Sequence, residues 1–198
     1  MYKALYNDFE IEIIDEQDYT VNSADNRFQY DIIHRDPEDD MYVPTSIYGI
    51  KLYRDGLYKT AIVLATGGRT GIGPDSAIID GQSLVLTCCN KVFNLQLPDL
   101  QLNWLVVADM ATCFSIYQYE DSYIVHGELE ITRLERSGKI MWQVGVRDIF
   151  VNIDHIGSTF QMHDEYIELM DWQGFRYKLF YNGTIVDDGM APLAPRHE

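Results

Sequence analysis

The sequence is poor in basic residues, and this deficit is its most unusual compositional feature. It has 15 lysines and arginines against 31 aspartates and glutamates in 198 residues, so the formal net charge is −16 at pH 7. A field of that sign repels phosphate groups, and we therefore expect no binding to nucleic acids or to anionic membranes. A basic protein partner would be attracted by the same field, although acidity also serves solubility alone.

Long apolar runs, an apolar leader segment and spaced cysteine pairs are lacking as well. No stretch approaches the roughly 20 apolar residues of a membrane helix, and residues 1–15 lack the continuous apolar segment of a signal peptide. The three cysteines, Cys88, Cys89 and Cys113, stand in apolar, strand-like surroundings without metal-ligand spacing. We expect buried free thiols, no structural zinc site, no bound cofactor and a cytoplasmic location.

Helical periodicity is nearly absent from the chain. Short runs rich in Val, Ile, Tyr, Phe and Leu alternate with turn signals instead. Four turns separate such runs, at Asp55-Gly56, Asn90-Lys91, Ser137-Gly138 and Asn182-Gly183. Asp-Gly and Asn-Gly pairs favour tight hairpins because both residues tolerate positive φ. The sequence therefore predicts an all-β chain.

The strand-like runs recur in groups of four with a period of about 40 residues, which is typical of a propeller blade. Trp104 and Trp142 stand at equivalent places in successive groups. We predict a single domain, 1–198, built as a propeller-like array of three to four four-stranded antiparallel units. Three repeats would occupy 76–187, after an irregular β portion over 1–75 and before a tail over 188–198. A two-sheet β-sandwich is the alternative, since short strands with regular turns also fit it.

Several motifs carry a resemblance to known repeats. The stretch LERSGKIMW (134–142) resembles the core of PQQ-type and WD40-like propeller repeats, in which a glycine turn is followed by a strand ending in Trp. FRYKLFYNGTIV (175–186) resembles a second copy, and NLQLPDLQLNW (94–104) a third without the glycine. This resemblance implies blade-like units but no quinone site, because three or four blades cannot enclose that cofactor as a full ring does. LPDLQLNW, ADMATCF and YIVHGELEITRL are similar to motifs of a group of uncharacterised bacterial proteins, which implies no activity.

The glycine-rich stretch ATGGRTGIGPDS (65–76) has the composition of a phosphate-binding loop but lacks its context. A Walker loop needs Gly-Lys-Ser/Thr at the start of a helix, because the lysine and the helix N-terminus together hold the phosphate. This stretch contains no lysine, and the strand-like run AIID follows it. We therefore expect it to connect one four-stranded unit to the next.

Connections between successive blades gather on one face of a propeller. Three of them, 65–76, 108–114 and 146–157, carry a set of charged and hydroxyl side chains: Arg69, Thr70, Asp75, Asp109, Thr112, Arg147 and Asp148. If these side chains converge, they form a small polar site for a ligand or a substrate. In the alternative interpretation, each Arg–Asp pair ties neighbouring units together.

Other candidate ligands for a metal have a weaker pattern. His126, Glu128 and Glu130 alternate, so all three would share one face of a continuous strand, but a solvated face has the same pattern. Asp154, His155 and His163 lie in turn-rich stretches without diagnostic spacing. The acidic run over 35–44 lacks the residue order of a calcium loop and is interpreted as solvated. We predict no metal site.

Among the aromatic residues, Trp104 and Trp142 are predicted in the core because they occupy equivalent repeat positions. Trp172, beside a turn, is the better candidate for a binding surface. Cys113 enters a strand-like run, where a buried thiol is expected rather than a nucleophile.

The repeats, the acidity and the lack of a catalytic signature together predict a non-enzymatic module that binds a protein partner. One form of this hypothesis is an immunity-like inhibitor that masks a basic toxin. The alternative is an enzyme or small-ligand binder that uses the Arg/Asp residues of the connections. Self-association through exposed edge strands is a third hypothesis.

Overall fold

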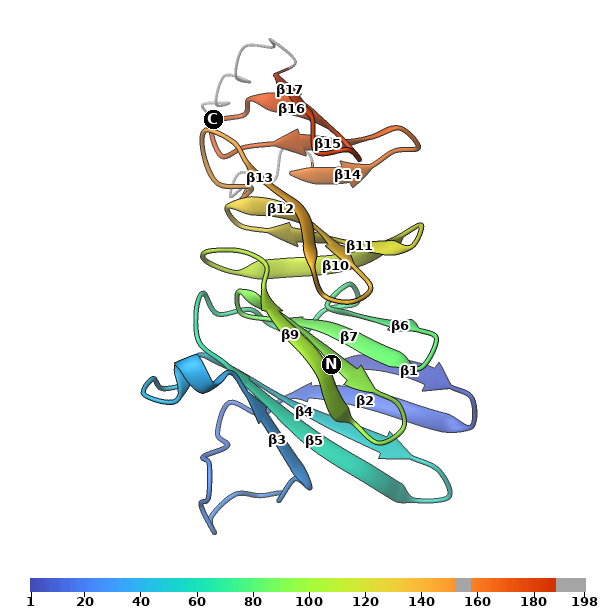
Figure 1. The fold of residues 1–198 in the computed structure, drawn as a ribbon. Helices are drawn as coiled ribbons and strands as arrows, with labels where there is room; N and C mark the ends of the chain where they lie inside the picture. The colour runs from blue at the N-terminus through green and yellow to red at the C-terminus, as the bar shows by residue number, and fades with distance from the viewer. Residues whose placement is uncertain (152–157, 188–198) are drawn as a thin grey trace, which may run out of the picture.

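The computed structural model describes residues 1–151 and 158–187, and its strands form four sheets stacked in chain order (Figure 1). The one helical element in these residues is a short 3-10 helix, η1, over Pro37–Asp39. Within the same residues, no helix has the length and apolar character needed to cross a membrane. The predicted tail over 188–198 and the residues Asp154 and His155 lie outside the described part of the chain.

The N-terminal sheet has five strands in the order β1-β2-β4-β5-β3. Their bounds are Tyr2–Tyr6 (β1), Phe9–Asp15 (β2), Ile32–Arg35 (β3), Ser46–Tyr53 (β4) and Leu57–Ala65 (β5). Neighbours pair antiparallel except β3, which runs parallel to β5. The sequence does not predict β1, because the apolar Leu5 occupies an exposed position and breaks the alternation of apolar and polar residues.

Each of the three following sheets is an antiparallel meander of four consecutive strands. The first unit contains β6 Ala77–Asp80, β7 Ser83–Cys88, β8 Lys91–Gln96 and β9 Gln101–Val107. The second contains β10 Cys113–Tyr119, β11 Ser122–Gly127, β12 Glu130–Glu135 and β13 Ile140–Gly145. The third contains β14 Phe160–Met162, β15 Tyr166–Met170, β16 Arg176–Phe180 and β17 Ile185–Asp187. The prediction of propeller-like four-stranded units is confirmed, and four sheets replace the two of a sandwich.

The core lies between the sheets. Ile50 and Val63 of the N-terminal sheet belong to one buried apolar cluster with Leu84 and Leu86 of the first unit. Two further clusters fill the spaces between units one and two and between units two and three. Both faces of the middle sheets are therefore buried, which explains why β7 reads as a continuous apolar run rather than an alternating one.

The two tryptophans that mark the repeat make the same contact at successive junctions. The indole N–H of Trp104 donates to the carbonyl of Arg136 at 2.9 Å, and that of Trp142 donates to the carbonyl of Tyr181 at 3.0 Å. Each ring lies against the glycine turn of the following unit, formed by Gly138 or Gly183. The predicted equivalence is confirmed, but both indoles are half-buried between sheets rather than enclosed in a core.

The two outer faces of the stack are covered or polar. Tyr19 and Tyr30, from the segment between β2 and β3, pack on Ile47, Ile62 and Leu64 of the N-terminal sheet.

On the last sheet, Ile167 and Leu169 point toward unit two, so their neighbours in β15 and β16 face outward. There Glu168 pairs with Arg176 at 2.6 Å, and Lys178 lies over the ring of Tyr166. Neither outer face therefore presents a large bare apolar surface.

The Trp–glycine contact generates a stability prediction. A Cβ at Gly138 would lie 2.6 Å from the Trp104 ring, on a backbone with φ of +85°. Gly81 also has positive φ, +59°, but a Cβ there meets nothing within 4 Å. We expect Gly138→Ala to lower the free energy of unfolding by about 2 kcal/mol more than Gly81→Ala, because only the first overpacks a junction.

Chemical denaturation of the two variants measures this difference. Equal losses would mean that the Trp104 ring moves aside without cost and that the contact does not hold the units together.

Candidate functional site

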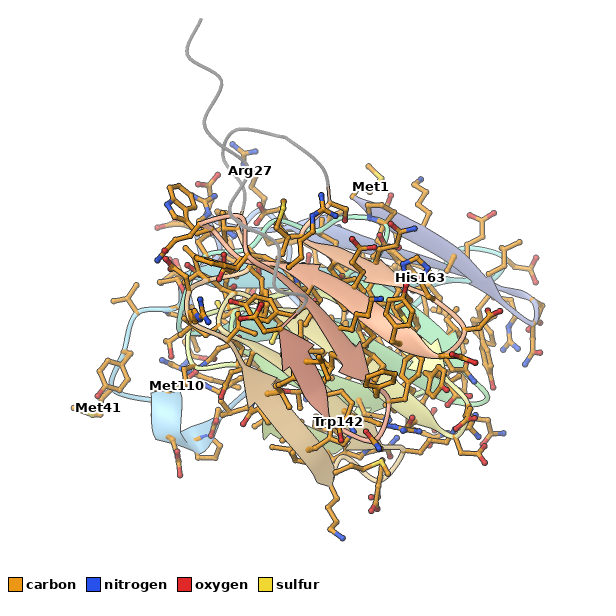
Figure 2. All side chains as sticks on the ribbon, turned by 90° about the horizontal axis from the view of Figure 1, so that it is seen from above. Met1, Arg27, Met41, Met110, Trp142 and His163 are labelled. Atoms are coloured by element: carbon orange, nitrogen blue, oxygen red, sulfur yellow. The ribbon has the colours of Figure 1, made fainter. Side chains whose placement is uncertain are left out.

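One end of the strands carries all the connections between sheets. In a four-stranded meander the turn between the second and third strands lies at the same end as the exit to the next unit. We call this surface the loop face; it comprises residues 36–45, 66–76, 89–90, 108–112, 128–129, 146–151 and 171–175. Seen down the stack, Met41 and Met110 of the loop face project on the same side of the molecule, away from His163 (Figure 2).

Asp109, one of the predicted site residues, is fully buried and has a structural role. Its Oδ1 accepts hydrogen bonds from the backbone amides of Ala111 and Thr112, at 2.6 and 2.9 Å. Its Oδ2 accepts from the amides of Leu129 and Glu130, at 2.9 and 2.8 Å. The carboxylate therefore joins the β9–β10 connection to the β11–β12 turn and is not directed at solvent.

Thr112 and Thr70 belong to the same junction. The Thr112 hydroxyl donates to the carbonyl of Gly68 at 3.0 Å, and the amide of Gly68 donates to Ala111 at 2.8 Å. Thr70 receives a hydrogen bond from the Cys89 amide on its hydroxyl, at 3.2 Å. These bonds tie the glycine-rich stretch to the first two four-stranded units.

Several backbone amides of the glycine-rich stretch are already occupied. Those of Gly68, Thr70 and Gly73 donate to Ala111, Ser46 and Ser76, respectively. A phosphate-binding loop needs such amides free to donate to the ligand. The stretch therefore connects β5 to β6, as expected.

The remaining predicted site residues do not converge. Arg147 pairs with Asp187 at 2.9 Å and lies over the Phe175 ring. Asp148 accepts from the side chain of Gln173 at 2.9 Å, and this bond, with one from the Ile149 amide, lowers the pKa of Asp148. Arg69 and Asp75 are exposed.

Within the described residues, no ion pair joins either predicted arginine to a predicted carboxylate. The expected Arg–Asp ties between neighbouring units are replaced by the backbone hydrogen bonds of Asp109.

The expectation that His126, Glu128 and Glu130 share one strand face is wrong. β11 ends at Gly127 and β12 begins at Glu130, so a turn separates the three residues. The His126 ring is buried, stacks on Phe160 at 4.6 Å between ring centroids, and also contacts Phe114. Burial lowers the pKa of His126 to about 3, so the ring is neutral at pH 7.

The acidic run over 35–44 is not the solvated loop expected from the sequence. Asp36 and Asp39 are buried beside Lys91, whose Nζ lies 3.4 Å from Asp36 and 2.7 Å from Asp39. Burial raises the pKa of Asp39, but hydrogen bonds from Lys91 and Thr66 outweigh it, so the pKa lies below its usual value. The sequence signal for this ion pair is a lysine at the start of a strand, β8, of mostly buried residues.

The buried ion pair fixes a loop that presents three apolar side chains to solvent. Met41, Tyr42 and Val43 are 92%, 65% and 84% exposed. The Arg35 guanidinium donates to the carbonyls of Asp39 and Tyr42 and so holds both ends of the turn. We call residues 41–43 the apolar segment of the loop face.

A groove of about 360 Å3 lies beside the apolar segment. Residues 17, 19–21, 35, 42–44, 47 and 64 line it. Two further large apolar side chains of the loop face are exposed, Met110 and Trp172, and the exposure of Trp172 agrees with its prediction. The loop face therefore combines apolar side chains with acidic loops.

Comparisons with known proteins give the fold alone. No protein-family model and no curated protein sequence matches this chain. Among solved structures, it is similar to BamB from Moraxella catarrhalis (15% identity, TM-score 0.47, 73% of this chain and 46% of that one). It is also similar to the CNH domain of AfRom2 (10% identity, TM-score 0.46, 73% of this chain and 48% of that one). A third similar structure is the dihydro-heme d1 dehydrogenase NirN (17% identity, TM-score 0.47, 75% of this chain and 34% of that one). The chain spans less than half the length of these structures.

The fold and the loop face thus define the class of protein, an all-β repeat protein with propeller-like four-stranded units. The function of this protein is proposed below from the loop face.

Asp109 generates a prediction that separates structure from ligand binding. Asp109→Ala leaves four backbone amides, one buried and three partly buried, without acceptors, so we expect a loss of at least about 3 kcal/mol of unfolding free energy. Asp75→Ala, at an exposed carboxylate of the neighbouring connection, should change it by less than about 0.5 kcal/mol. Urea unfolding of both variants measures these changes. A small loss of unfolding free energy for Asp109→Ala would mean that the carboxylate is not needed for stability and can serve a ligand instead.

His126 predicts a dependence of stability on pH. Its pKa is lower in the folded state than in the unfolded chain, so the unfolded chain binds a proton first as the pH falls through about 6.5. Stability is therefore lost on acidification, by about 2 kcal/mol between pH 7 and 5. His126→Phe should lack this part of the loss.

Unfolding free energies of wild type and His126→Phe over that pH range make the comparison. Parallel curves for the two proteins would contradict the assignment of the pH dependence to His126.

Proposed function

We propose that this chain is a non-enzymatic protein-binding module whose loop face recognises a basic partner. The single observation that carries the proposal is the apolar segment of the loop face, held in place by the buried Lys91–Asp39 ion pair. One form of the proposal is an immunity-like inhibitor that covers a basic toxin.

The first argument concerns rigidity. Burying a lysine and two aspartates carries a large desolvation cost, so an ion pair of this kind is weak support for stability as such. What Lys91 does achieve is a fixed conformation for the acidic turn, with Arg35 bonded to its carbonyls. A segment ordered before binding loses less conformational entropy on binding, and large apolar side chains are the usual anchors of an interface.

The second argument concerns charge. Glu38 and Asp40 are exposed immediately before the apolar segment, and the whole chain carries a net charge of −16. Carboxylates around an apolar centre match a partner with an apolar pocket and a basic rim. Such complementarity accelerates association and makes the affinity depend on salt.

Two finer assignments belong to the same proposal. The Trp–glycine contact repeated at Trp104 and Trp142 supports descent of the units from PQQ-type or WD40-like repeats. The three cysteines are buried and free, which supports a cytoplasmic location, where thiols stay reduced.

A second candidate function, binding of a small ligand or substrate by the predicted Arg/Asp residues, rests on the exposed Arg69 and Asp75. It has less support, because Thr70, Asp109 and Thr112 direct their polar atoms at the protein itself. This candidate predicts a ligand that raises the melting temperature of wild type but not of Arg69→Ala.

The partner hypothesis predicts the behaviour of a triple variant. Met41→Ala/Tyr42→Ala/Val43→Ala keeps every charge and removes only exposed side chains, so we expect a folded protein with at least about 100-fold weaker partner binding. The matched control is Leu5→Ala, which removes another exposed apolar side chain, 73% exposed, from β1. Affinity capture with wild type, control and triple variant as baits is followed by calorimetry on the purified, identified partner.

The expected result is one basic protein that wild type and Leu5→Ala retain and the triple variant loses, with an affinity that falls as salt rises. Equal retention by all three baits, or an affinity independent of salt, would contradict the proposed interface. A blank capture together with a ligand whose effect requires Arg69 would favour the second candidate.

A further inference from the structure

Two adjacent thiols lie together beneath the loop face. Cys88 is the last residue of β7, and Cys89 begins the turn to β8 with a left-handed φ of +52°. Successive side chains of a regular strand point to opposite faces, and the left-handed residue breaks that alternation. Both sulfurs accordingly contact neighbouring residues of one segment: Cys88 Sγ lies 3.8 Å from the Ser46 carbonyl and Cys89 Sγ 3.2 Å from the Thr45 hydroxyl.

The expected turn at Asn90-Lys91 is therefore displaced by one residue in the structure. Cys89 and Asn90 form the turn, and Lys91 is the first residue of β8. This shift places Cys89 in the left-handed position and is the reason the two thiols meet.

The surroundings of the two thiols are unequal. The pKa of Cys89 is lowered to about 6, and the largest cause is a hydrogen bond from the Cys88 thiol. Together with further hydrogen bonds from Ser46 and Thr45, this bond outweighs burial, which would raise the pKa. Burial raises the pKa of Cys88 well above its usual value. Cys89 is therefore the more acidic thiol of the pair and Cys88 keeps its proton, the arrangement of an attacking and a resolving thiol.

Thr45 is an exposed residue in contact with the pair. The Cys89 side chain is buried, but Thr45, whose hydroxyl contacts its sulfur, is exposed. We therefore expect a hydroperoxide to reach Cys89 only after Thr45 moves, which breaks the 2.9 Å hydrogen bond from its hydroxyl to the Gly67 carbonyl. Cys113 provides an internal contrast, since it is buried and its pKa is raised by burial and by Asp109.

We propose that Cys88 and Cys89 form a reversible redox site, in which a hydroperoxide oxidises Cys89 and Cys88 then closes a vicinal disulfide. This inference stands apart from the proposed partner binding and does not rest on it.

The chemistry balances in two steps. The Cys89 thiolate attacks the distal oxygen of the hydroperoxide; the O–O bond breaks, and the alkoxide or hydroxide that leaves is protonated by solvent. The Cys88 sulfur then attacks the Cys89 sulfenic acid, the S–O bond breaks, and water leaves with the Cys88 proton. The two thiols lose two electrons in total, and the hydroperoxide gains them.

The disulfide formed in this way would be labile. Cα atoms of neighbouring residues lie about 3.8 Å apart, which is shorter than the usual span of a disulfide. A strained disulfide has a more oxidising potential and is reduced readily by cellular thiols. Reversibility follows from the adjacency of the two cysteines.

Oxidation would also act on the loop face. The backbone of Cys89 accepts a hydrogen bond from the Cys113 amide at 2.6 Å and donates one to Thr70 at 3.2 Å. Its side chain bonds to Thr45, which follows the apolar segment closely in the chain. A new Cys88–Cys89 bond removes the thiolate from Thr45 and changes the junction where three sheets meet.

The test treats the folded full chain with dilute hydrogen peroxide and measures intact and peptide masses. We expect wild type and Cys113→Ser to lose two hydrogens, with the bond mapped to Cys88 and Cys89 and reversed by dithiothreitol. Cys88→Ser keeps a hydrogen-bond donor but not the resolving sulfur, so it should stop at a sulfenic acid that dimedone traps. Cys89→Ser should stay unmodified.

Thr45→Val supplies a matched control for the role of the hydroxyl. It keeps the size of the side chain but removes the hydroxyl that contacts the Cys89 sulfur, so the midpoint of the alkylation rate against pH should rise from its wild-type value of about 6. Native circular dichroism before treatment verifies that each variant is folded.

Three outcomes would overturn the proposal: cysteines that stay unmodified in the folded wild type, oxidation that occurs first at Cys113, or disulfides formed between chains. A wild-type alkylation midpoint near that of an ordinary thiol would overturn it as well.

Discussion

Apolar contact between one sheet and the next is the interaction on which the whole structure depends. An isolated four-stranded sheet with two apolar faces is not stable in water, and each unit here buries its faces only by stacking on its neighbours. The three buried clusters lie in these spaces. At two of these junctions the indole of Trp104 or Trp142 also packs against a glycine turn of the next unit, where a Cβ would overlap the ring.

Stacking of this kind also decides where polar groups are placed. Apolar side chains fill the spaces between the sheets, and a group of polar side chains with specific contacts lies in the connections at one end. Some of them, such as Asp109 and Thr112, satisfy backbone amides and carbonyls that the stacked sheets bury. Others, such as Lys91 with Asp39, hold a turn whose apolar residues face solvent. The loop face is therefore partly framework and partly available surface, and only the second part can carry function.

The contact between Thr45 and Cys89 links the proposed interface to the proposed redox pair. Thr45 lies between the apolar segment and the start of β4, and its hydroxyl contacts the Cys89 sulfur. The acidic turn, the glycine-rich stretch and the β7–β8 turn thus share one hydrogen-bonded region. A chemical change at the thiols has a direct structural path to the surface that we propose for partner binding.

The sequence by itself determined the β class, the four-strand repeat, the glycine turns and the equivalence of Trp104 and Trp142. These features depend on local patterns: alternation along a strand, backbone conformations that glycine favours, and a recurring period. Tertiary structure alone decided that Asp109 is a buried framework group, that His126 is a core ring and that Lys91 pairs with Asp39. The physical reason is that burial and pairing of polar groups depend on residues far apart in the chain, whose approach is set by how the sheets stack.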